Sequence, residues 1–380
     1  MPLLAQLPLT DAEELDIANK VQSAKNFQQI CAIFGYRHEE HVVTTDDGYL
    51  LLLQRILARE SSASSSPTQG RRRVVYVQHG LCTNSEMFMR VTDARKCIPL
   101  VLAERGYDVW MGNNRGNKYS RNHLHKNVDS PDFWDFCIDD FARYDIPTSI
   151  DYVLNLTGQA KISYVGFSQG TAQAFAALSI HPDLNDRIDV FVALAPIMLP
   201  AGYSFSYLDS FVKRDPSVIY RLFGRKSMIS WVAMWQSILP AFILHRCVDV
   251  ALIYLLGFYN KNITPTQKIA GYNNIYCSSS VKAVVHWSQI MRNSVFSTYE
   301  DGTGNAASLT RYPTQKITTP IVLIYGDHDS LFDLETVLKH LPQNVTCRRL
   351  HDYEHLDVLW GGKVHEDVIP KVLDALASYS

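Results

Sequence analysis

The sequence has almost no excess of charge and no cysteine pattern typical of a metal site. Its 36 Lys and Arg residues nearly balance its 38 Asp and Glu residues, which gives a net charge of −2. This balance does not favour a nucleic-acid partner, because nucleic acids attract strongly basic surfaces. The seven cysteines are scattered and odd in number, so not all can pair within one chain. They indicate buried thiols in a reducing compartment, and we expect no metal and no cofactor.

Long apolar runs are also lacking. A membrane-spanning helix needs about 20 mainly apolar residues. The stretch from Ile229 to Leu244 is interrupted by Gln236 and Pro240, and the stretch from Cys247 to Tyr259 is shorter and contains Asp249. The N-terminal residues MPLLAQLPLTDAEELD have no basic start and no long apolar centre, so they make a poor signal peptide. We therefore expect an intracellular protein without a transmembrane helix.

What the sequence does contain is an alternation of apolar strands with helical segments. Of its 380 residues, 47% are hydrophobic, which is enough for one large core. Strands are predicted at 41–45, 49–57, 74–78, 108–111, 162–165, 190–195, 321–325 and 345–350. Helices are predicted at 11–34, 93–105, 139–156, 169–180, 333–341 and 364–378, and a polar loop at 59–71. This alternation predicts an α/β fold with a mostly parallel, eight-stranded sheet and helices on both faces.

The alternation stops after Pro196 and resumes only at Ile321. A connection of this length is uncommon unless it has a function of its own. We expect three parts, which are a first core part at 1–196, a helical cap at 197–315 and a second core part at 316–380. The cap should cover the carboxyl edge of the sheet, where open α/β sheets bind ligands. Four of its aromatic residues either line an apolar tunnel or pack in an ordinary core: Phe205, Trp231, Trp235 and Trp287.

A serine between two glycines marks the boundary between a predicted strand and a predicted helix. The stretch YVGFSQGTAQAFAAL places Ser168 directly after an apolar run and before an Ala-rich run, between Gly166 and Gly170. A sharp turn of this kind suits glycines, because a side chain at either position would collide with the neighbouring backbone. The same pattern also occurs in turns without a catalytic role. As a nucleophile, Ser168 would need a base to take its proton.

Candidate acid and base residues follow in the chain order of an α/β-hydrolase, which is Ser, Asp, His. The stretch YGDHDSLFD, after the strand at 321–325, offers Asp327, Asp329 and Asp333, of which Asp333 is the better helix cap. The stretch YEHLDVLW, after the last strand, offers His355 as the base. Three further histidines lie nearby, but less directly at a strand end: His328, His351 and His365.

Two backbone N–H groups are candidates to stabilise the oxyanion that forms when an ester is attacked. One belongs to Gln169, directly after the serine, and the other to Leu81, which follows His79-Gly80 in the stretch QHGLCTNSEMF. The His79-Gly80 pair is also compatible with an ordinary turn. The glycine-rich stretch GNNRGNKYS at 112–120 lacks the Lys-Ser/Thr of a phosphate loop, and we expect it to shape the floor of the site.

Together these residues resemble the acid lipase family, which contains the gastric and lysosomal acid lipases and the fungal steryl ester hydrolases. The resemblance runs from residue 30 to residue 375 and rests on VVTTDDGYLLLLQRI, VQHGL, GYDVWMGNNRGNKYS, FWDFCIDDFARYDIPTSIDYVL, GFSQGTAQAF and YEHLDVLW. It implies an α/β-hydrolase fold and the following roles: Ser168 as nucleophile, Asp329 as acid, His355 as base, and Leu81 and Gln169 at the oxyanion. Asp329 is preferred over Asp327 because the family pattern places its acid two residues before Leu331.

The predicted cap is similar to the intracellular fungal branch of the family in the segments FGRKSMISWVAMWQ and SSVKAVVHWSQIMRN. This likeness implies a serine hydrolase of long-chain lipid esters, with steryl esters as first choice and triacylglycerols as second. It also implies contact with a lipid-droplet or membrane surface, for which the apolar region 229–259 is the candidate. The fungal members usually carry an N-terminal hydrophobic anchor, and this chain shows none. Two other classes stay open, which are an acyltransferase and a non-catalytic lipid-binding protein of the same fold.

Overall fold

The computed structural model describes residues 8–57, 72–200, 202, 209–210, 215, 217–228, 238, 241–272, 276–301 and 310–379. The predicted polar loop at 59–71 lies outside the described residues, and so do three of the four proposed tunnel residues, Phe205, Trp231 and Trp235. Within the described part, no helix combines the length and the apolar character needed to cross a bilayer.

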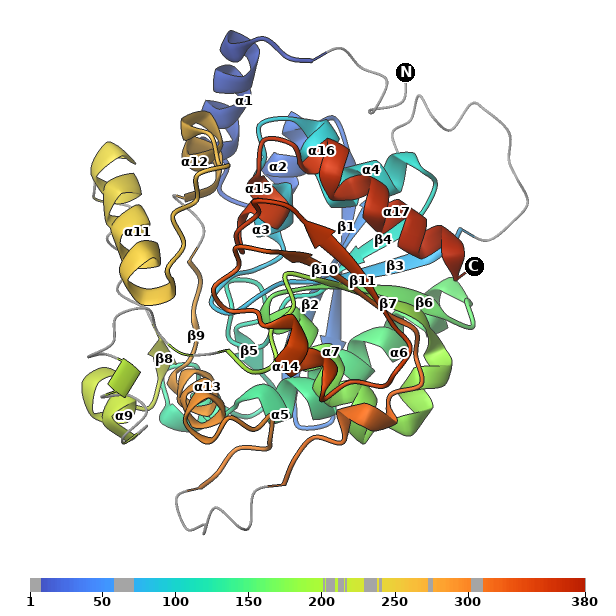
Figure 1. Cartoon of the computed structure of the whole chain (residues 1–380), viewed down its shortest axis with the longest axis vertical. Coiled ribbons are helices and arrows are strands. Elements are labelled where there is room, and N and C mark those ends of the chain that lie inside the picture. Colours follow the sequence, from blue (N-terminus) through green and yellow to red (C-terminus); the bar gives the residue numbers. More distant parts are fainter. Residues whose placement is uncertain are drawn as a thin grey trace.

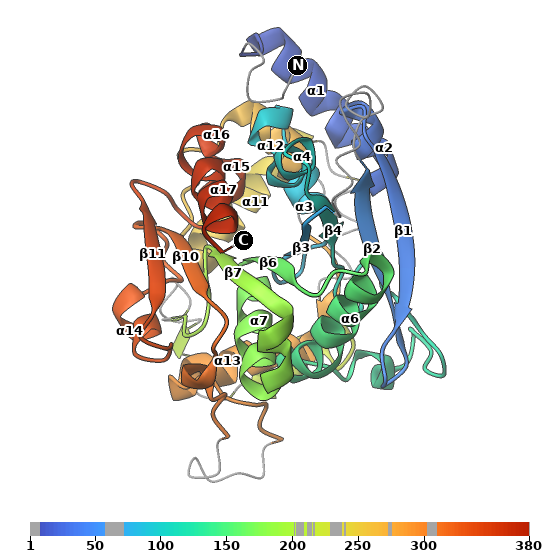
Figure 2. The ribbon, with the colours of Figure 1, turned by 90° about the vertical axis from the view of Figure 1, so that its right-hand side faces the viewer.

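A twisted, mostly parallel sheet forms the centre of the molecule (Figures 1 and 2). Its strands are β1 (Arg37–Thr44), β2 (Tyr49–Leu57), β3 (Val74–Gln78), β4 (Asp108–Met111), β5 (Asn122–His123), β6 (Ile162–Phe167), β7 (Ile188–Leu194), β10 (Ile321–Gly326) and β11 (Val345–Leu350). Eight of them follow the order β1-β2-β4-β3-β6-β7-β10-β11, and the two-residue β5 adds to β2. β1 pairs antiparallel with β2 and β2 antiparallel with β4, whereas the path from β4 to β11 is parallel. The predicted α/β fold with a mostly parallel, eight-stranded sheet is confirmed.

Burial of each strand follows its place in the sheet. Every residue of β3, β4, β6 and β10 is buried, because helices cover both faces of these strands. Strands of this kind read as continuous apolar runs in a sequence. The two edge strands are much more open, since β1 fully buries only Val43 and β11 only Leu350. The carboxyl ends of the parallel strands therefore meet at one edge of a well-buried sheet, where ligand sites of this architecture lie.

Helices cover both faces of the sheet (Figure 2). One face carries α2 (Phe27–Ile33), α3 (Glu86–Met89), α4 (Ile98–Glu104), α15 (Asp357–Trp360), α16 (Val364–Asp367) and α17 (Ile369–Ser378). The N-terminal helix α1 (Asp11–Ser23) lies beyond this layer and packs next to α2. The other face carries α5 (Ile138–Asp140), α6 (Ile146–Thr157), α7 (Gln169–Ile180) and α14 (Leu334–Leu338). Each layer packs an apolar cluster of its own against the strands. The sheet is thus buried from both sides, as the sequence pattern predicts.

The predicted helices at 11–34, 139–156 and 364–378 were wrong as single helices, because each divides into shorter elements. The predicted helix at 11–34 divides into α1 and α2, and the Asn26 side chain caps the start of α2. A π-helical turn interrupts the second just before Pro147, which has no N–H to donate and stands at the start of α6. The third divides at Val368, with Pro370 at the start of α17. Side-chain caps and prolines therefore decide these boundaries more strongly than the apolar period does.

The chain between β7 and β10 lies beside the sheet (Figure 1). Its described elements are α9 (Ser217–Phe223), β8 (Ser227–Met228), α11 (Ala241–Leu256), α12 (Pro265–Tyr272), β9 (Ser279–Ser280), α13 (Val281–Asn293) and the short 3-10 helix η8 (Thr314–Lys316). β8 and β9 form a small antiparallel sheet of their own. Side chains of α9, α11 and α13 share one cavity with the loops that follow β3, β6 and β11. This segment therefore covers the carboxyl ends of those strands.

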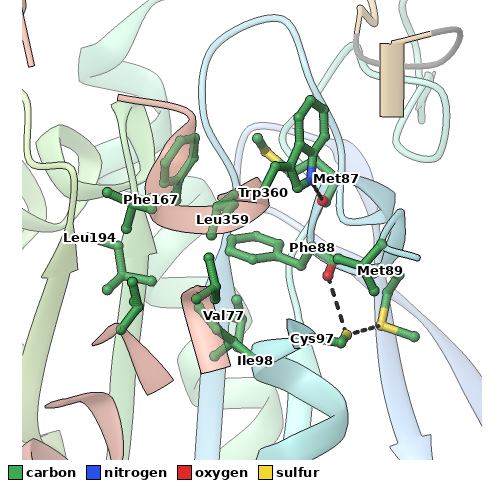
Figure 3. Close-up of a cluster of buried hydrophobic side chains, with 14 of the residues drawn as sticks. Val77, Met87, Phe88, Met89, Cys97, Ile98, Phe167, Leu194, Leu359 and Trp360 are labelled. Atoms are coloured by element: carbon green, nitrogen blue, oxygen red, sulfur yellow. Dashed lines mark hydrogen bonds between the residues drawn. The ribbon is translucent and has the colours of Figure 1, made fainter. Parts of the chain in front are cut away.

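An apolar cluster holds three of these loop regions against the sheet (Figure 3). Phe167 is the last residue of β6, and its ring meets the ring of Phe88 in α3 edge to face at 6.3 Å. Trp360 of α15 donates its Nε1–H to the backbone oxygen of Met87, also in α3, at 3.0 Å. Leu194, the last residue of β7, belongs to the same cluster. The segments that follow β3, β6 and β11 are thereby fixed relative to one another.

Candidate active site

Ser168 stands on the turn between β6 and α7 in a conformation that residues with a side chain rarely adopt, with φ 54° and ψ −125°. The neighbouring glycines leave no room for side chains. A Cβ on Gly170 would lie 2.5 Å from the backbone oxygen of Gln78, and a Cβ on Gly166 would lie 2.9 Å from that of Gly170. Packing therefore requires both glycines of the sequence motif. A strained strand-to-helix turn of this kind presents the serine hydroxyl at the end of the sheet.

The structure brings Ser168, His355 and Asp329 together from three different strand ends. His355 Nε2 lies 2.8 Å from Ser168 Oγ, and His355 Nδ1 lies 2.7 Å from Asp329 Oδ2. All three residues are buried. Because Nδ1–H is donated to the carboxylate, Nε2 is left to accept the proton of the serine hydroxyl. This is the geometry that a nucleophile, its base and the orienting acid require.

Further contacts fix the His355 ring and the Asp329 carboxylate. Phe258 stacks on the imidazole with the ring centroids 5.1 Å apart and the planes at 12°, and Phe167 packs on it at 5.2 Å. The backbone N–H of Leu331 donates to Asp329 Oδ1 at 3.0 Å. Phe258 could not be singled out from the sequence, because one phenylalanine in an apolar stretch carries no sign of what its ring will contact. The His355 ring is thus held by two aromatic rings and an oriented carboxylate.

The other carboxylates and histidines that the sequence offered make different contacts. Asp327 accepts hydrogen bonds from Arg349 at 2.6 Å and from His351 at 2.9 Å. Asp333 caps α14, as expected, by accepting from the backbone N–H of Thr336 at 2.8 Å. The three competing histidines lie beside carboxylates away from Ser168: His328 by Asp352, His351 by Asp327 and His365 by Glu366. Of the candidates, the structure places only Asp329 and His355 with the serine.

Two backbone N–H groups beside Ser168 are available as donors. Among the described residues, neither the Leu81 N–H nor the Gln169 N–H has a hydrogen-bond acceptor. Gln169 is the first residue of α7, where N–H groups have no acceptor within the helix. A Cβ on Gly80 would lie 3.0 Å from Ser168 Cβ, so the loop before Leu81 passes directly beside the serine. Such N–H groups are suited to bind an oxyanion.

The His79 ring fixes the peptide that carries the Leu81 N–H. His79 Nδ1 lies 2.8 Å from the Gly80 backbone oxygen, and the Thr83 hydroxyl donates to the same oxygen at 3.1 Å. The Asn114 N–H donates to His79 Nε2 at 3.0 Å, which places the ring proton on Nδ1. Because C=O and N–H point in opposite directions across a planar trans peptide, fixing the Gly80 oxygen also fixes the Leu81 N–H. The glycine-rich segment at 112–120 supports the site through this Asn114 contact.

The free energy of unfolding is expected to decrease at acid pH because His79 is buried in its neutral form. Burial lowers the pKa of His79 to about 4, from the usual value of 6.5. Between these pH values the unfolded chain binds a proton that the folded chain does not, so the free energy of unfolding decreases as the pH falls. We expect a loss of about 2–3 kcal/mol from about pH 7 to about pH 4.5. Denaturant titrations should show the wild-type advantage over His79→Gln shrinking by that amount, and a constant difference would contradict this assignment.

A cavity of about 390 Å³ opens beside Ser168 and His355. Its size falls within the range of roughly 300–1,000 Å³ found for small-molecule sites. Apolar side chains form most of its wall, among them Phe223, Leu255, Leu256, Phe258, Trp287 and Leu356. Trp287 was expected either to line a tunnel or to pack in a core; it lines this cavity and also belongs to a buried apolar cluster. Ser168 and His355 thus stand in the wall of an apolar cavity.

Two groups of described side chains are close enough to hold a metal ion. One is Cys137 with Asp139 and His286, and the other is Asp327 with His328 and Asp352. Neither group includes Ser168, Asp329 or His355. The residues at Ser168 are instead of the kinds that can act as nucleophile, base, orienting carboxylate and N–H donors.

The chain is similar to proteins of known family over most of its length. A family described as the alpha/beta hydrolase fold matches residues 73–247, and a partial alpha/beta-hydrolase lipase region matches residues 27–91. A probable lipase of Schizosaccharomyces pombe is 44% identical over 371 residues, which cover 96% of this chain and 82% of that protein. Gastric triacylglycerol lipase of Bos taurus is 31% identical over 376 residues, 95% of this chain and 93% of that protein.

The human lysosomal acid lipase/cholesteryl ester hydrolase is a further relative, with 32% identity over 330 residues that cover 82% of this chain and 81% of that protein. Among solved structures, the carboxylesterase CesB from Bacillus subtilis superposes with a TM-score of 0.51 at 13% identity, over 97% of this chain and 99% of that one. The α/β-hydrolase GrgF from a Penicillium species superposes with a TM-score of 0.54 at 15% identity, over 90% and 99%. At these identities the structural likeness shows the fold alone.

Proposed function

Because this chain belongs to the acid lipase family of α/β-hydrolases and is an ester hydrolase of the lipase type, we propose that it cleaves long-chain lipid esters through an acyl-enzyme on Ser168. The observation that carries this proposal is the contact of Ser168 with His355 at 2.8 Å, and of His355 with Asp329 at 2.7 Å, in the wall of an apolar cavity. Steryl esters are the proposed first substrate and triacylglycerols the second.

In the proposed reaction, the Ser168 oxygen attacks the ester carbonyl carbon while His355 Nε2 takes the hydroxyl proton. The resulting oxyanion accepts hydrogen bonds from the N–H groups of Leu81 and Gln169. His355 then donates its proton to the departing alcohol oxygen, which leaves the fatty acyl group on Ser168. Asp329 holds the ring in the correct tautomer and stabilises the imidazolium. A water molecule, deprotonated by His355, then attacks the acyl carbon, and the proton returns to Ser168 as the fatty acid leaves.

The proposed substrate class is supported by the cavity and by the relatives. Walls of leucine, phenylalanine and tryptophan exclude water and favour a long acyl chain over a charged or short one. One relative is named for triacylglycerol and another for cholesteryl esters. Of these two, we propose the steryl ester first because the segments that resemble the fungal steryl ester hydrolases, around Met228 and Trp287, contribute to the cavity wall.

The test compares cholesteryl oleate, triolein and a short water-soluble ester in detergent micelles, each with wild type and Ser168→Ala. Serine-dependent release of fatty acid, faster from cholesteryl oleate than from triolein, is the expected result. Faster release from triolein would overturn the steryl ester assignment and favour a triacylglycerol lipase. Turnover of the short ester alone would overturn the long-chain assignment. New ester formed after addition of a free sterol would indicate an acyltransferase.

We also propose that the segment 197–315 is a cap that meets a lipid surface through α11. On this helix Val250 is 53% exposed and Tyr254 is 59% exposed, and residues four positions apart share one helix face. Leu255 is 41% exposed and also lines the cavity, so the apolar surface and the cavity meet at this residue. An exposed apolar helix face beside a lipid-sized cavity suits interfacial contact. Within the predicted contact region 229–259, the proposal concerns α11; residues 229–237 and 239–240 lie outside the described residues.

Placing negative charges on this face of α11 is expected to lower the rate on an emulsified ester but not the rate on a dissolved ester. The double variant Val250→Glu with Tyr254→Glu should lose about 10-fold or more of its rate on an emulsified ester, because it removes two apolar side chains from the lipid surface. Its rate on a dissolved short ester should be unchanged, because the cavity wall is intact. Leu156→Glu, at the exposed end of α6, is the matched control and should behave as wild type on both substrates. Equal losses on both substrates would contradict the assignment.

A further inference from the structure

A hydrogen bond joins the residue after the nucleophile to a helix outside the sheet. Trp287 of α13 donates its Nε1–H to the side-chain oxygen Oε1 of Gln169 at 2.8 Å. Both residues are buried, and 118 positions of sequence separate them. Gln169 is also the residue whose free backbone N–H is the second proposed oxyanion donor. The contact therefore links the segment between β7 and β10 directly to the peptide beside Ser168.

The rest of α13 is well anchored, so Trp287 is a fixed donor. Ser280 caps the helix by accepting from the Ala283 N–H at 2.9 Å, and its hydroxyl donates to the backbone oxygen of Phe136. Lys282 pairs with Asp135 at 2.9 Å. Further along, the Gln289 amide makes two hydrogen bonds with the backbone of Glu300, at 2.8 and 3.0 Å. The helix is thereby held at both ends, and Trp287 belongs to the buried apolar cluster on the face of the sheet that α6 and α7 cover.

We propose that Trp287 is a positioning residue for the oxyanion donor of Gln169, an inference that rests on the proposed function. The Ser168–Gln169 peptide follows a residue in a disfavoured conformation, so its orientation must be held by surrounding contacts. The peptide plane itself is held by Thr171, whose N–H and hydroxyl both donate to the Ser168 backbone oxygen, at 2.8 and 2.6 Å. The Trp287 bond fixes the Gln169 side chain. It also directs the Gln169 side-chain oxygen toward Trp287. A free amide oxygen could instead accept one of the two N–H groups that the oxyanion needs.

The same indole ring lines the substrate cavity. A bound acyl chain therefore contacts the residue that holds the oxyanion donor. Because the hydrogen bond uses Nε1–H and the cavity contact uses the ring carbons, phenylalanine at position 287 keeps most of the apolar contact and removes the donor. This allows positioning of Gln169 to be separated from binding of the acyl group.

The central test is Trp287→Phe on the short water-soluble ester. Loss of a complete oxyanion donor costs about 100- to 1,000-fold in kcat. A donor that the freed Gln169 amide oxygen occupies for part of the time should therefore cost about 10-fold, with KM within about two-fold of wild type. Binding of a trifluoromethyl ketone, which forms an oxyanion on the serine, should weaken by a similar factor. An unchanged kcat and an unchanged inhibitor affinity would overturn the proposal.

A double-mutant cycle shows whether Trp287 acts through Gln169. Gln169→Met keeps the backbone N–H and the side-chain length but removes the acceptor, so adding Trp287→Phe to it should cost little more. Additive losses would overturn the proposal, because they would show that the two side chains act separately. Ile290→Val, a buried neighbour on α13 outside the cavity wall, is the stability control and should keep the wild-type kcat. If Ser168→Ala hydrolyses the ester as wild type does, the proposed function itself fails; if only the Trp287 effects are missing, this inference alone fails.

Discussion

Replacing Ser168 by alanine is expected to lower kcat for lipid esters by roughly 10⁴- to 10⁶-fold, because the nucleophile and the acyl-enzyme are both lost. The remaining rate should reflect the two N–H donors acting on an attacking water. Ser168 is buried on a turn that packing already fixes, and its hydroxyl contacts His355 rather than supporting the sheet. The melting temperature should therefore stay close to that of wild type. Fatty-acid release measured by titration, with a denaturation curve for each protein, checks both expectations.

The Ser168→Ala result is decisive only if the variant is folded. A folded variant with at least a tenth of the wild-type rate would show that another group attacks the ester, since removing a triad nucleophile costs roughly 10⁴-fold or more. In that case the contact between Ser168 and His355 would be structural. An inactive and unfolded variant would be replaced by Ser168→Cys, which keeps a nucleophile of similar size and should retain a measurable fraction of activity on an activated ester.

The second large effect is expected at Asp329, with a neighbour of the same chemistry as its control. Asp329→Asn should lower kcat by roughly 10⁴-fold, because the amide no longer holds the proton on His355 Nδ1 and the ring presents the wrong tautomer to Ser168. Asp327 lies two residues earlier on the same loop, but it contacts Arg349 and His351. Asp327→Asn should therefore keep kcat and lose only stability. Steady-state rates for the two variants, measured under identical conditions, test which carboxylate orients the base.

A reversed pattern would identify Asp327 as the acid and contradict the geometry at His355. Equal, small losses in both variants would show that His355 works without an oriented carboxylate. The comparison is informative because the sequence offered both residues in one short stretch, YGDHDSLFD, and their roles differ only in which side chains they meet.

The sequence placed the fold and the three candidate catalytic side chains because these depend on local patterns. Buried parallel strands read as apolar runs, and their carboxyl ends converge at one edge of the sheet. Ser168 and Asp329 each follow such a run, and His355 follows the more open edge strand β11, so a serine, an aspartate and a histidine could be expected to meet at this edge. The choice of Asp329 over Asp327 came from the family resemblance. The glycines at 166 and 170 were readable for the same reason, since a sharp turn limits which residues can flank it.

The contacts that support the three candidate catalytic side chains could not be predicted from local sequence patterns. Phe258 stacks on His355 and Trp287 bonds to Gln169, yet each lies in an apolar stretch where many aromatic residues would look alike. Which of them reaches the site depends on how the segment between β7 and β10 packs over the strand ends. The helix boundaries failed for a different reason. The breaks at Asn26 and Val368 come from a capping side chain and a following proline, which act against an uninterrupted helical period.

Covalent trapping of the nucleophile tests the central claim most directly. A long-chain p-nitrophenyl phosphonate mimics the ester and leaves a stable phosphonyl group on an activated serine. Incubation with the wild-type protein, followed by peptide mass mapping, should show one adduct per chain, on Ser168, formed in step with the loss of activity. Ser168→Ala should form none. Inactivation with the adduct on another residue, or full loss of activity with Ser168 unmodified, would contradict the account.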